Sequence, residues 1–347
     1  MRRGASQEES LSQSLLGTEL VRVLVGKEQR EFTLHKRLLC IVSPYFRENL
    51  EATAKDDEDG AADSASLWFA DESPEVFELF VFWLYRRRAC RLFIDRASHK
   101  AGRVAEASRD ELHWTLVGLH LFGLLVEVPA LQDASMDAIQ DLYLRCDWDV
   151  TPRFVAYLYG GGDGSCSVEG AGAPCRLRKW AVAMTAWTLC GAGARGLALA
   201  GRFQRLFEKY PVLFAEYCAH RRKLAAARCD PRLKNPQLRL PRNSLRAEER
   251  FFGFRQCSFH SHRAAVGEAD CPLGLGLGAA RDLAVGPAPL LPAVPKKWLP
   301  RARGQTEREE VEEEAEAQAA SDESDTDQDI LVPVSDQEDR TFWLAGI

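Results

Sequence analysis

The fold of this chain is decided by the stretch LVRVLVGKEQREFTL, residues 20–34. Val21, Val23 and Val25 fall on one side of an extended chain, and the same period of two returns at Phe32 and Leu34. The four residues GKEQ between these runs have the composition of a turn. The stretch therefore predicts a β-hairpin with one buried face.

The apolar period changes to that of a helix directly after the hairpin. One helical stripe over residues 35–42 carries His35, Leu38, Leu39 and Val42. Ser43-Pro44 ends this helix and starts another, because serine caps free amides and proline fits the first helical position. The apolar side of the second helix consists of Tyr45, Phe46 and Leu50.

A strand and a strongly apolar helix follow. Residues 54–65 are acidic and small, which predicts a solvated loop, and residues 66–69 (SLWF) predict a short strand. Ser73-Pro74 repeats the capping arrangement and begins a helix over residues 75–86 that is apolar nearly all round. Such a helix must be covered on two sides, so we expect it to bury its surface against the hairpin.

This order of elements resembles a BTB/POZ domain over about residues 19–142. The residues that carry the resemblance are Phe32, His35, Leu38, Leu39, Ser43, Pro44, Tyr45, Phe46, Phe77, Phe80, Trp83, Leu84 and Tyr85. The form FELFxxWLY at residues 77–85 is similar to the version common in filamentous fungi. The resemblance implies an α+β fold of short strands flanked by helices, which serves self-association and partner recruitment and has no catalytic site.

The BTB/POZ-like domain is expected to occupy residues 19–145. Leu92-Phe93-Ile94 predicts a last strand, after a run of three arginines that suits the C-terminal end of the preceding helix. Apolar stripes beginning at Arg109 and at Val128-Pro129 predict a closing pair of helices.

A helical extension is predicted over residues 151–228. It begins at Thr151-Pro152 and continues with helices over residues 177–190, 203–210 and 213–217, which resemble the extension of fungal BTB proteins. The glycine cluster at residues 160–164 has neither the Lys-Ser/Thr pair nor the preceding strand of a phosphate-binding loop.

The composition of the chain indicates a non-secreted protein. Of its 347 residues 46% are hydrophobic, yet residues 1–18 contain no apolar run and read as a flexible N-terminus. The longest uncharged runs are shorter than the roughly 20 residues that span a bilayer, and ten cysteines without a secretion signal indicate free thiols. We therefore expect an intracellular protein, cytoplasmic or nuclear or both, without membrane association.

The stretch from Arg221 to Arg263 is basic. It holds twelve Arg or Lys against three Asp or Glu, and four phenylalanines lie among them. This pattern offers an alternative function, a nuclear nucleic-acid-associated or transcription-related protein. Residues 304–340 hold fifteen acids against two arginines, so neutralisation within the chain is the interpretation we favour over nucleic-acid binding.

One set of candidate metal ligands lies in residues 229–272, a basic segment that contains cysteine and histidine. Cys257, His260, His262 and Cys271 offer two thiolates and two imidazoles, the set that tetrahedral zinc prefers. In an extended chain the two histidines would point the same way, and Cys229 competes as a ligand. The other interpretation is a loop that contains these residues without a metal, and the sequence indicates no further cofactor.

Residues 273–347 read as a glycine- and proline-rich linker followed by a disordered acidic tail. Within the tail, acids and hydroxyls precede an aliphatic run made of Ile330, Leu331, Val332 and Val334. This run resembles a motif that binds small ubiquitin-like modifiers by adding a strand to the partner's sheet. The other interpretation is a segment that docks on its own chain or has no function.

Together these features predict a non-enzymatic protein-interaction module. No catalytic constellation stands out, and the resemblance implies a homodimer or heterotypic association through the BTB/POZ domain. Many family members are adaptors for cullin-type ubiquitin ligases. Where they place an apolar-x-Glu contact after the second helix, this chain has the polar loop from Thr53 to Ser66.

Overall fold

The computed structural model describes residues 17–56, 66–101, 105–160, 175–191, 193–240, 242–244, 248–262 and Cys271. The predicted N-terminal segment, the acidic tail and the aliphatic run from Ile330 to Val334 therefore lie outside the described residues, apart from Gly17 and Thr18. All the structural statements below concern the described part of the chain.

The hairpin forms as the sequence predicts, and a third strand extends it. β1 (Leu20–Val25) pairs antiparallel with β2 (Arg30–His35) and parallel with β3 (Ser66–Phe69), so the strand order is β2-β1-β3. The register sets Val21 opposite Leu34 and Val23 opposite Phe32, which places the apolar residues of both strands on one face. The parallel pairing of β1 and β3 requires a crossover, and two helices supply it.

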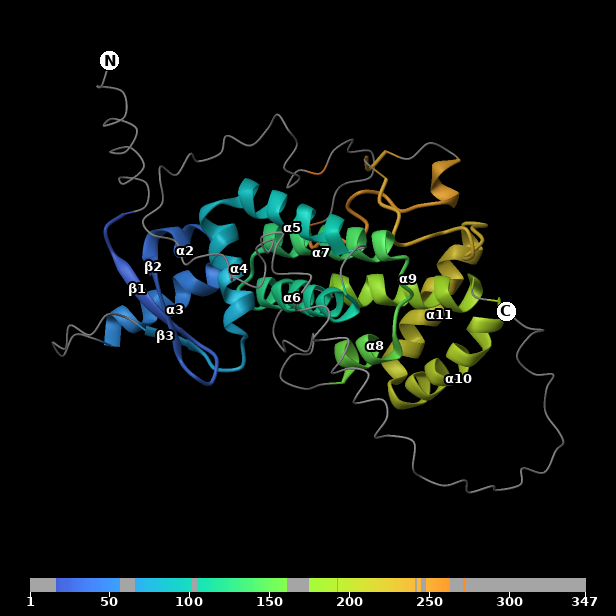
Figure 1. Ribbon diagram of the computed structural model, residues 1–347, viewed down its shortest axis with the longest axis horizontal. Helices are drawn as coiled ribbons and strands as arrows, with labels where there is room; N and C mark the ends of the chain where they lie inside the picture. Colours follow the sequence, from blue (N-terminus) through green and yellow to red (C-terminus); the bar gives the residue numbers. More distant parts are fainter. Residues whose placement is uncertain are drawn as a thin grey trace, which may run out of the picture. The chain divides into compact units, whose positions relative to one another are not determined.

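Helices make up most of the described chain, and Figure 1 shows their order. They are α2 (Lys36–Val42), α3 (Pro44–Asp56), α4 (Pro74–Tyr85), α5 (Arg87–Ala101), α6 (Glu106–Leu125), α7 (Pro129–Cys146), α8 (Pro152–Tyr159), α9 (Arg176–Gly191), α10 (Gly193–Lys209) and α11 (Pro211–Ala226), with a 3-10 turn η2 at Glu249–Phe251. None of the helices in the described ranges is long and apolar enough to cross a membrane.

Aromatic side chains from two strands of the sheet and from helices α4 and α6 form the core of the first half. Phe32 of β2 and Phe69 of β3 both contact Phe77 of α4, at ring-centroid distances of 4.8 and 6.1 Å. Phe122 of α6 packs edge-on against Phe80 of α4 at 5.1 Å, and both rings are fully buried. The hairpin and α4 therefore cover each other as predicted, and Phe122 of α6 joins the same group of rings, since it also packs against Phe69 and Phe77.

Both Ser-Pro pairs begin helices, as predicted. The Ser43 hydroxyl accepts from the amide of Phe46 at the start of α3, and it also donates to the carbonyl of Val126 at 2.6 Å. The Ser73 hydroxyl accepts from the amide of Glu75 at the start of α4. Ser43 therefore joins the start of α3 to the end of α6 while it caps.

His35 lies half-buried at the junction of the hairpin and α2, where its ring is hydrogen-bonded. Its Nδ1 lies 2.7 Å from the hydroxyl of Tyr85, and its backbone amide donates to the same hydroxyl. Tyr85 is the last residue of α4, so this pair fixes the end of the apolar helix against the hairpin.

The predicted strand at Leu92-Phe93-Ile94 is wrong, because these residues lie inside α5. Cys90 and Ile94 are buried while Leu92 between them is 51% exposed, so burial does not return at every second residue as it would in a strand. The arginine run is divided as well. Arg86 ends α4 and Arg87 begins α5, where its guanidinium stacks over the Trp83 ring at 4.5 Å.

The helical extension and the closing helices α6 and α7 together form a second aromatic core. His113 of α6 and Tyr143 of α7 are in contact, and Phe154 of α8 packs against both of their rings. Trp180 of α9 lies against Tyr143 at 4.8 Å and is fully buried. The extension is therefore packed on α6 and α7 and continues their core.

We call residues 229–271, which follow α11, the strap, and its described residues run back over the closing helices. The carbonyl of Pro236 accepts from the side chains of both Gln140 of α7 and Trp180 of α9. The Gln237 side chain donates to the carbonyl of Trp148 at 2.7 Å, and Arg239 pairs with Asp141 of α7. The described part of the strap is therefore folded against α7 and α9.

Candidate metal centre

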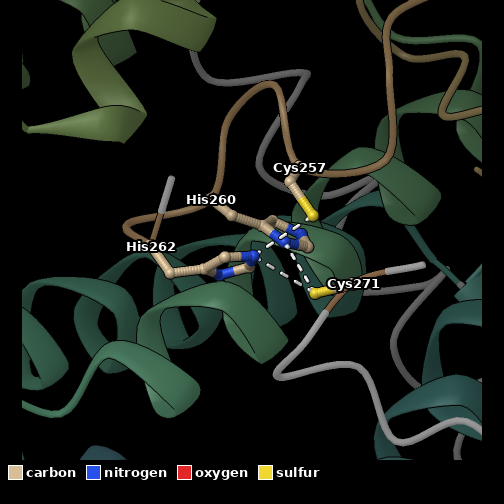
Figure 2. Close-up of side chains that lie close together, drawn as sticks. All are labelled: Cys257, His260, His262 and Cys271. Atoms are coloured by element: carbon tan, nitrogen blue, oxygen red, sulfur yellow. Dashed lines mark hydrogen bonds between the residues drawn. The ribbon is translucent and has the colours of Figure 1, made fainter. Parts of the chain in front are cut away.

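The four residues predicted as metal ligands come together at one place on the strap. Cys257, His260, His262 and Cys271 each offer one ligand atom, and these atoms all lie within 4.8 Å of one another. Figure 2 shows the four side chains pointing toward a common point, three from one turn of the chain and Cys271 from a separate stretch.

A turn and not an extended strand brings the first three ligands together. The amide of Ser258 donates to the carbonyl of Arg255, and the amide of His260 donates to that of Cys257. The backbone over residues 256–259 is thus a succession of turns. The premise that the two histidines align because the chain is extended is therefore wrong, although both of their rings reach the cluster.

Each histidine points one ring nitrogen into the cluster and the other toward a carboxylate of α7. Nδ1 of His260 lies 3.5 Å from the Cys271 sulfur, while its Nε2 lies 2.8 Å from Oδ1 of Asp137. Nε2 of His262 lies 3.2 Å from the sulfur of Cys257, while its Nδ1 contacts a carboxylate oxygen of Asp133. The two aspartates of α7 therefore orient the imidazoles from outside, while the two cysteine sulfurs face them inside the cluster.

Neighbouring polar groups also orient the thiol of Cys257. The Asn243 side chain accepts from the amide of Cys257 at 2.9 Å and donates to its sulfur at 3.2 Å. Asp133 also accepts from the amide and hydroxyl of Ser261, so the turn between the two histidines is tied to α7. These bonds hold the cluster in shape from outside.

Three of the four residues of the cluster are buried, and their surroundings favour positive charge. His260 is 2% exposed, and Cys257 and Cys271 are each 8% exposed. Burial lowers the pKa of His260, but the hydrogen bond with Asp137 and the neighbouring Cys271 and Asp133 outweigh burial and raise this pKa to about 10. The carboxylates of α7 thus stabilise a positive charge at this point, whether on a proton or on a metal ion.

Cys229, which the sequence also offers as a possible ligand, does not join the cluster. Its sulfur donates instead to the carbonyls of Ala227 and Arg250. Sequence reasoning also missed Asn243 of the strap, and it missed Asp133 and Asp137, since an acid on a distant helix carries no local signal of its own. The hydrogen bond between Asp137 and His260 spans 123 residues of the chain.

The basic segment uses several of its cations and aromatic rings inside the fold. The ammonium of Lys234 donates to the carbonyl of Gly253 at 2.6 Å, and Arg239 pairs with Asp137 as well as Asp141. Phe259 is buried and packs against Phe254 at 4.9 Å. These groups stabilise the strap, whereas Phe251 and Phe252 of the same segment are 37% and 53% exposed.

Fold and cluster together define a class of protein: an α+β scaffold for protein interaction, which carries a helical extension and a closed Cys2His2 cluster. Residues 14–99 match the family model of the BTB/POZ domain, and this part of the chain is a BTB/POZ domain. BTB/POZ domains are protein-protein interaction modules. No curated protein and no solved structure matches the chain.

Proposed function

We propose that this protein is a non-enzymatic interaction protein that associates with a second copy of itself through its BTB/POZ domain. The observation that carries the proposal is the BTB/POZ domain itself, matched over residues 14–99 and built around the sheet and α4. The helical extension and the strap lie beyond the matched residues, and in this proposal they select the partner protein.

Two exposed aliphatic side chains support an interface on the first half of the domain. Leu20 at the start of β1 is 48% exposed, and Ile41 in α2 is 58% exposed. The register partner of Leu20 is His35, the residue that directly precedes α2. Covering such side chains in a dimer removes apolar surface from water and favours association.

Sedimentation of the full-length chain at micromolar concentration tests self-association. We expect the mass of a dimer, and we expect Leu20→Arg combined with Ile41→Arg to shift the equilibrium toward the monomer by at least about tenfold in the dissociation constant. Val212→Arg is the matched control, because Val212 is 59% exposed but lies on α11, outside the matched domain. A monomeric parent chain would contradict the proposal.

The finer role that we propose is that of an adaptor, including an adaptor for a cullin-type ubiquitin ligase. In the BTB/POZ family many members have this role, whereas this chain has a polar stretch where an apolar-x-Glu contact is common. Residues 57–65 of that stretch lie outside the described residues. Co-purification with a cullin scaffold is the test, and no binding at micromolar concentration would remove this role and leave self-association standing.

The alternative function is association with nucleic acid. A filter-binding assay at varied salt identifies it, because phosphate contacts weaken linearly in the logarithm of salt concentration. We expect no such binding from a chain that lacks residues 304–347, since Lys234, Arg239 and Phe259 are used inside the fold. Binding at low salt with a steep salt dependence would favour the alternative.

A further inference from the structure

We propose that Cys257, His260, His262 and Cys271 bind one structural zinc ion, and that Asp133 and Asp137 of α7 form its outer shell, so that the metal fastens the strap to the closing helix of the domain. This inference goes beyond the proposed interaction function. It rests on the identity of the ligand atoms, the distances among them, and the partners of the remaining histidine nitrogens.

The separations between ligand atoms suit a tetrahedral ion. With Zn–S near 2.3 Å and Zn–N near 2.0–2.1 Å, adjacent nitrogen and sulfur ligands of a tetrahedron lie about 3.5 Å apart. The nitrogen–sulfur distances in the cluster are 3.2, 3.4 and 3.5 Å. Two thiolates and two imidazoles are a soft ligand set of the kind that holds Zn²⁺, and the two thiolate charges balance the ion.

The outer nitrogens of both histidines are used as zinc sites use them. A metal-bound imidazole usually donates its other N–H to a carboxylate, which fixes the ring and strengthens the ligand. Asp137 is in position to accept from Nε2 of His260, and Asp133 to accept from Nδ1 of His262. The Asn243 side chain is in position to donate to the Cys257 sulfur and so stabilise a thiolate there.

The site is structural and not catalytic. All four tetrahedral positions are taken by protein atoms, and three of the four residues are nearly inaccessible to solvent. A catalytic zinc keeps one position for water or substrate. The ion instead joins two stretches of the strap to each other and, through the carboxylates, to α7.

Metal analysis of the full-length protein is the first test. We expect one zinc per chain from protein purified without chelator, and a loss of at least tenfold in bound zinc for Cys257→Ser and for Cys271→Ser. Cys229→Ser is the matched control, because Cys229 lies on the same strap with the same 8% exposure but outside the cluster. It is expected to keep one zinc.

Cobalt substitution tests the ligand set even where a cysteine variant fails to fold. The full-length parent chain, stripped of zinc and loaded with Co²⁺, is expected to give intense visible bands of tetrahedral cobalt and a thiolate-to-cobalt charge-transfer band. Weak octahedral bands without charge transfer would overturn the proposal.

Competition with a chelator tests the outer shell separately. Asp133→Asn and Asp137→Asn keep all four ligands, and each is expected to weaken zinc binding 10- to 100-fold. Asp141→Asn is the control, because Asp141 lies one turn further along α7 and pairs with Arg239. Full zinc affinity in the first two variants would overturn the outer-shell assignment, and a zinc-free parent with a Cys257–Cys271 disulfide would overturn the whole proposal.

Discussion

At the scale of single residues, His113 lies in an aromatic environment in the helical core. Its ring lies among Trp114, Tyr143, Trp148 and Phe154, and its Nε2 is 3.1 Å from the Tyr143 hydroxyl. Burial lowers the pKa of His113 to about 4; the charge of Asp110 opposes this shift more weakly, and the charge of Arg153 adds to it. The folded protein therefore keeps this imidazole neutral at a pH where an unfolded chain takes up a proton.

This difference predicts a loss of stability in mild acid. Well above pH 6.5 His113 is neutral in both states and contributes no pH dependence. As the pH falls from 6.5 to about 4, only the unfolded state gains the proton, so the free energy of unfolding falls by about 3 kcal/mol. Urea unfolding at several pH values measures this slope. The His113→Gln variant is expected to show a flatter slope, and equal slopes in both proteins would contradict the assignment.

At the scale of elements, the two Ser-Pro pairs look alike in sequence but have different surroundings. Ser43 is completely buried, and its hydroxyl both caps α3 and donates to Val126 at the end of α6. Ser73 is only half-buried, and its hydroxyl bonds with Glu75 of its own helix. The same local motif thus stabilises one helix at Ser73 and joins two helices at Ser43.

Replacing the two serines separates these roles. Ser73→Ala is expected to cost about 1 kcal/mol of unfolding free energy, the usual loss of a cap. Ser43→Ala is expected to cost about 2–4 kcal/mol, because it also leaves the carbonyl of Val126 without its hydroxyl donor. Denaturant unfolding of both variants compares them directly, and equal losses would contradict the role of the Val126 bond.

At the scale of the whole molecule, the strap completes the core of the helical extension. Trp180 and Gln140 both donate to the carbonyl of Pro236, and the buried side chain of Gln237 donates to Trp148. Without the strap, these buried donors of α7 and α9 would have to find other acceptors or open to water. The predicted boundary at residue 228 therefore does not mark an independent folding unit.

Two truncated chains test this dependence. The chain 1–272 retains the whole strap, whereas the chain 1–228 lacks it, and both lack the tail. We expect the shorter chain to unfold at a lower temperature by at least about 5 °C, and its tryptophan emission to shift to the red because Trp180 loses its cover. Identical melting temperatures and emission would show that the strap adds no stability.

Much of the fold could be predicted because its signals are local. The alternation of Val21, Val23 and Val25, the serine and proline at the helix starts, and the all-round apolar surface of α4 each depend on a few adjacent residues. The prediction of a strand at Leu92-Phe93-Ile94 was wrong. A short apolar run fits both the two-residue repeat of a strand and the three-to-four-residue repeat of a helix. Its burial against neighbouring helices decided for a helix.

The sequence alone therefore determined the hairpin, the capped helices, the BTB/POZ identity and the types of side chain available for a metal. Only the tertiary structure decided which groups meet: β1 beside β3, the strap over α7, and Asp133 and Asp137 beside two histidines more than 120 residues away. The physical reason is that the period of a strand and the cap of a helix each depend on a few neighbouring residues. A contact across 120 residues depends on how every intervening element packs.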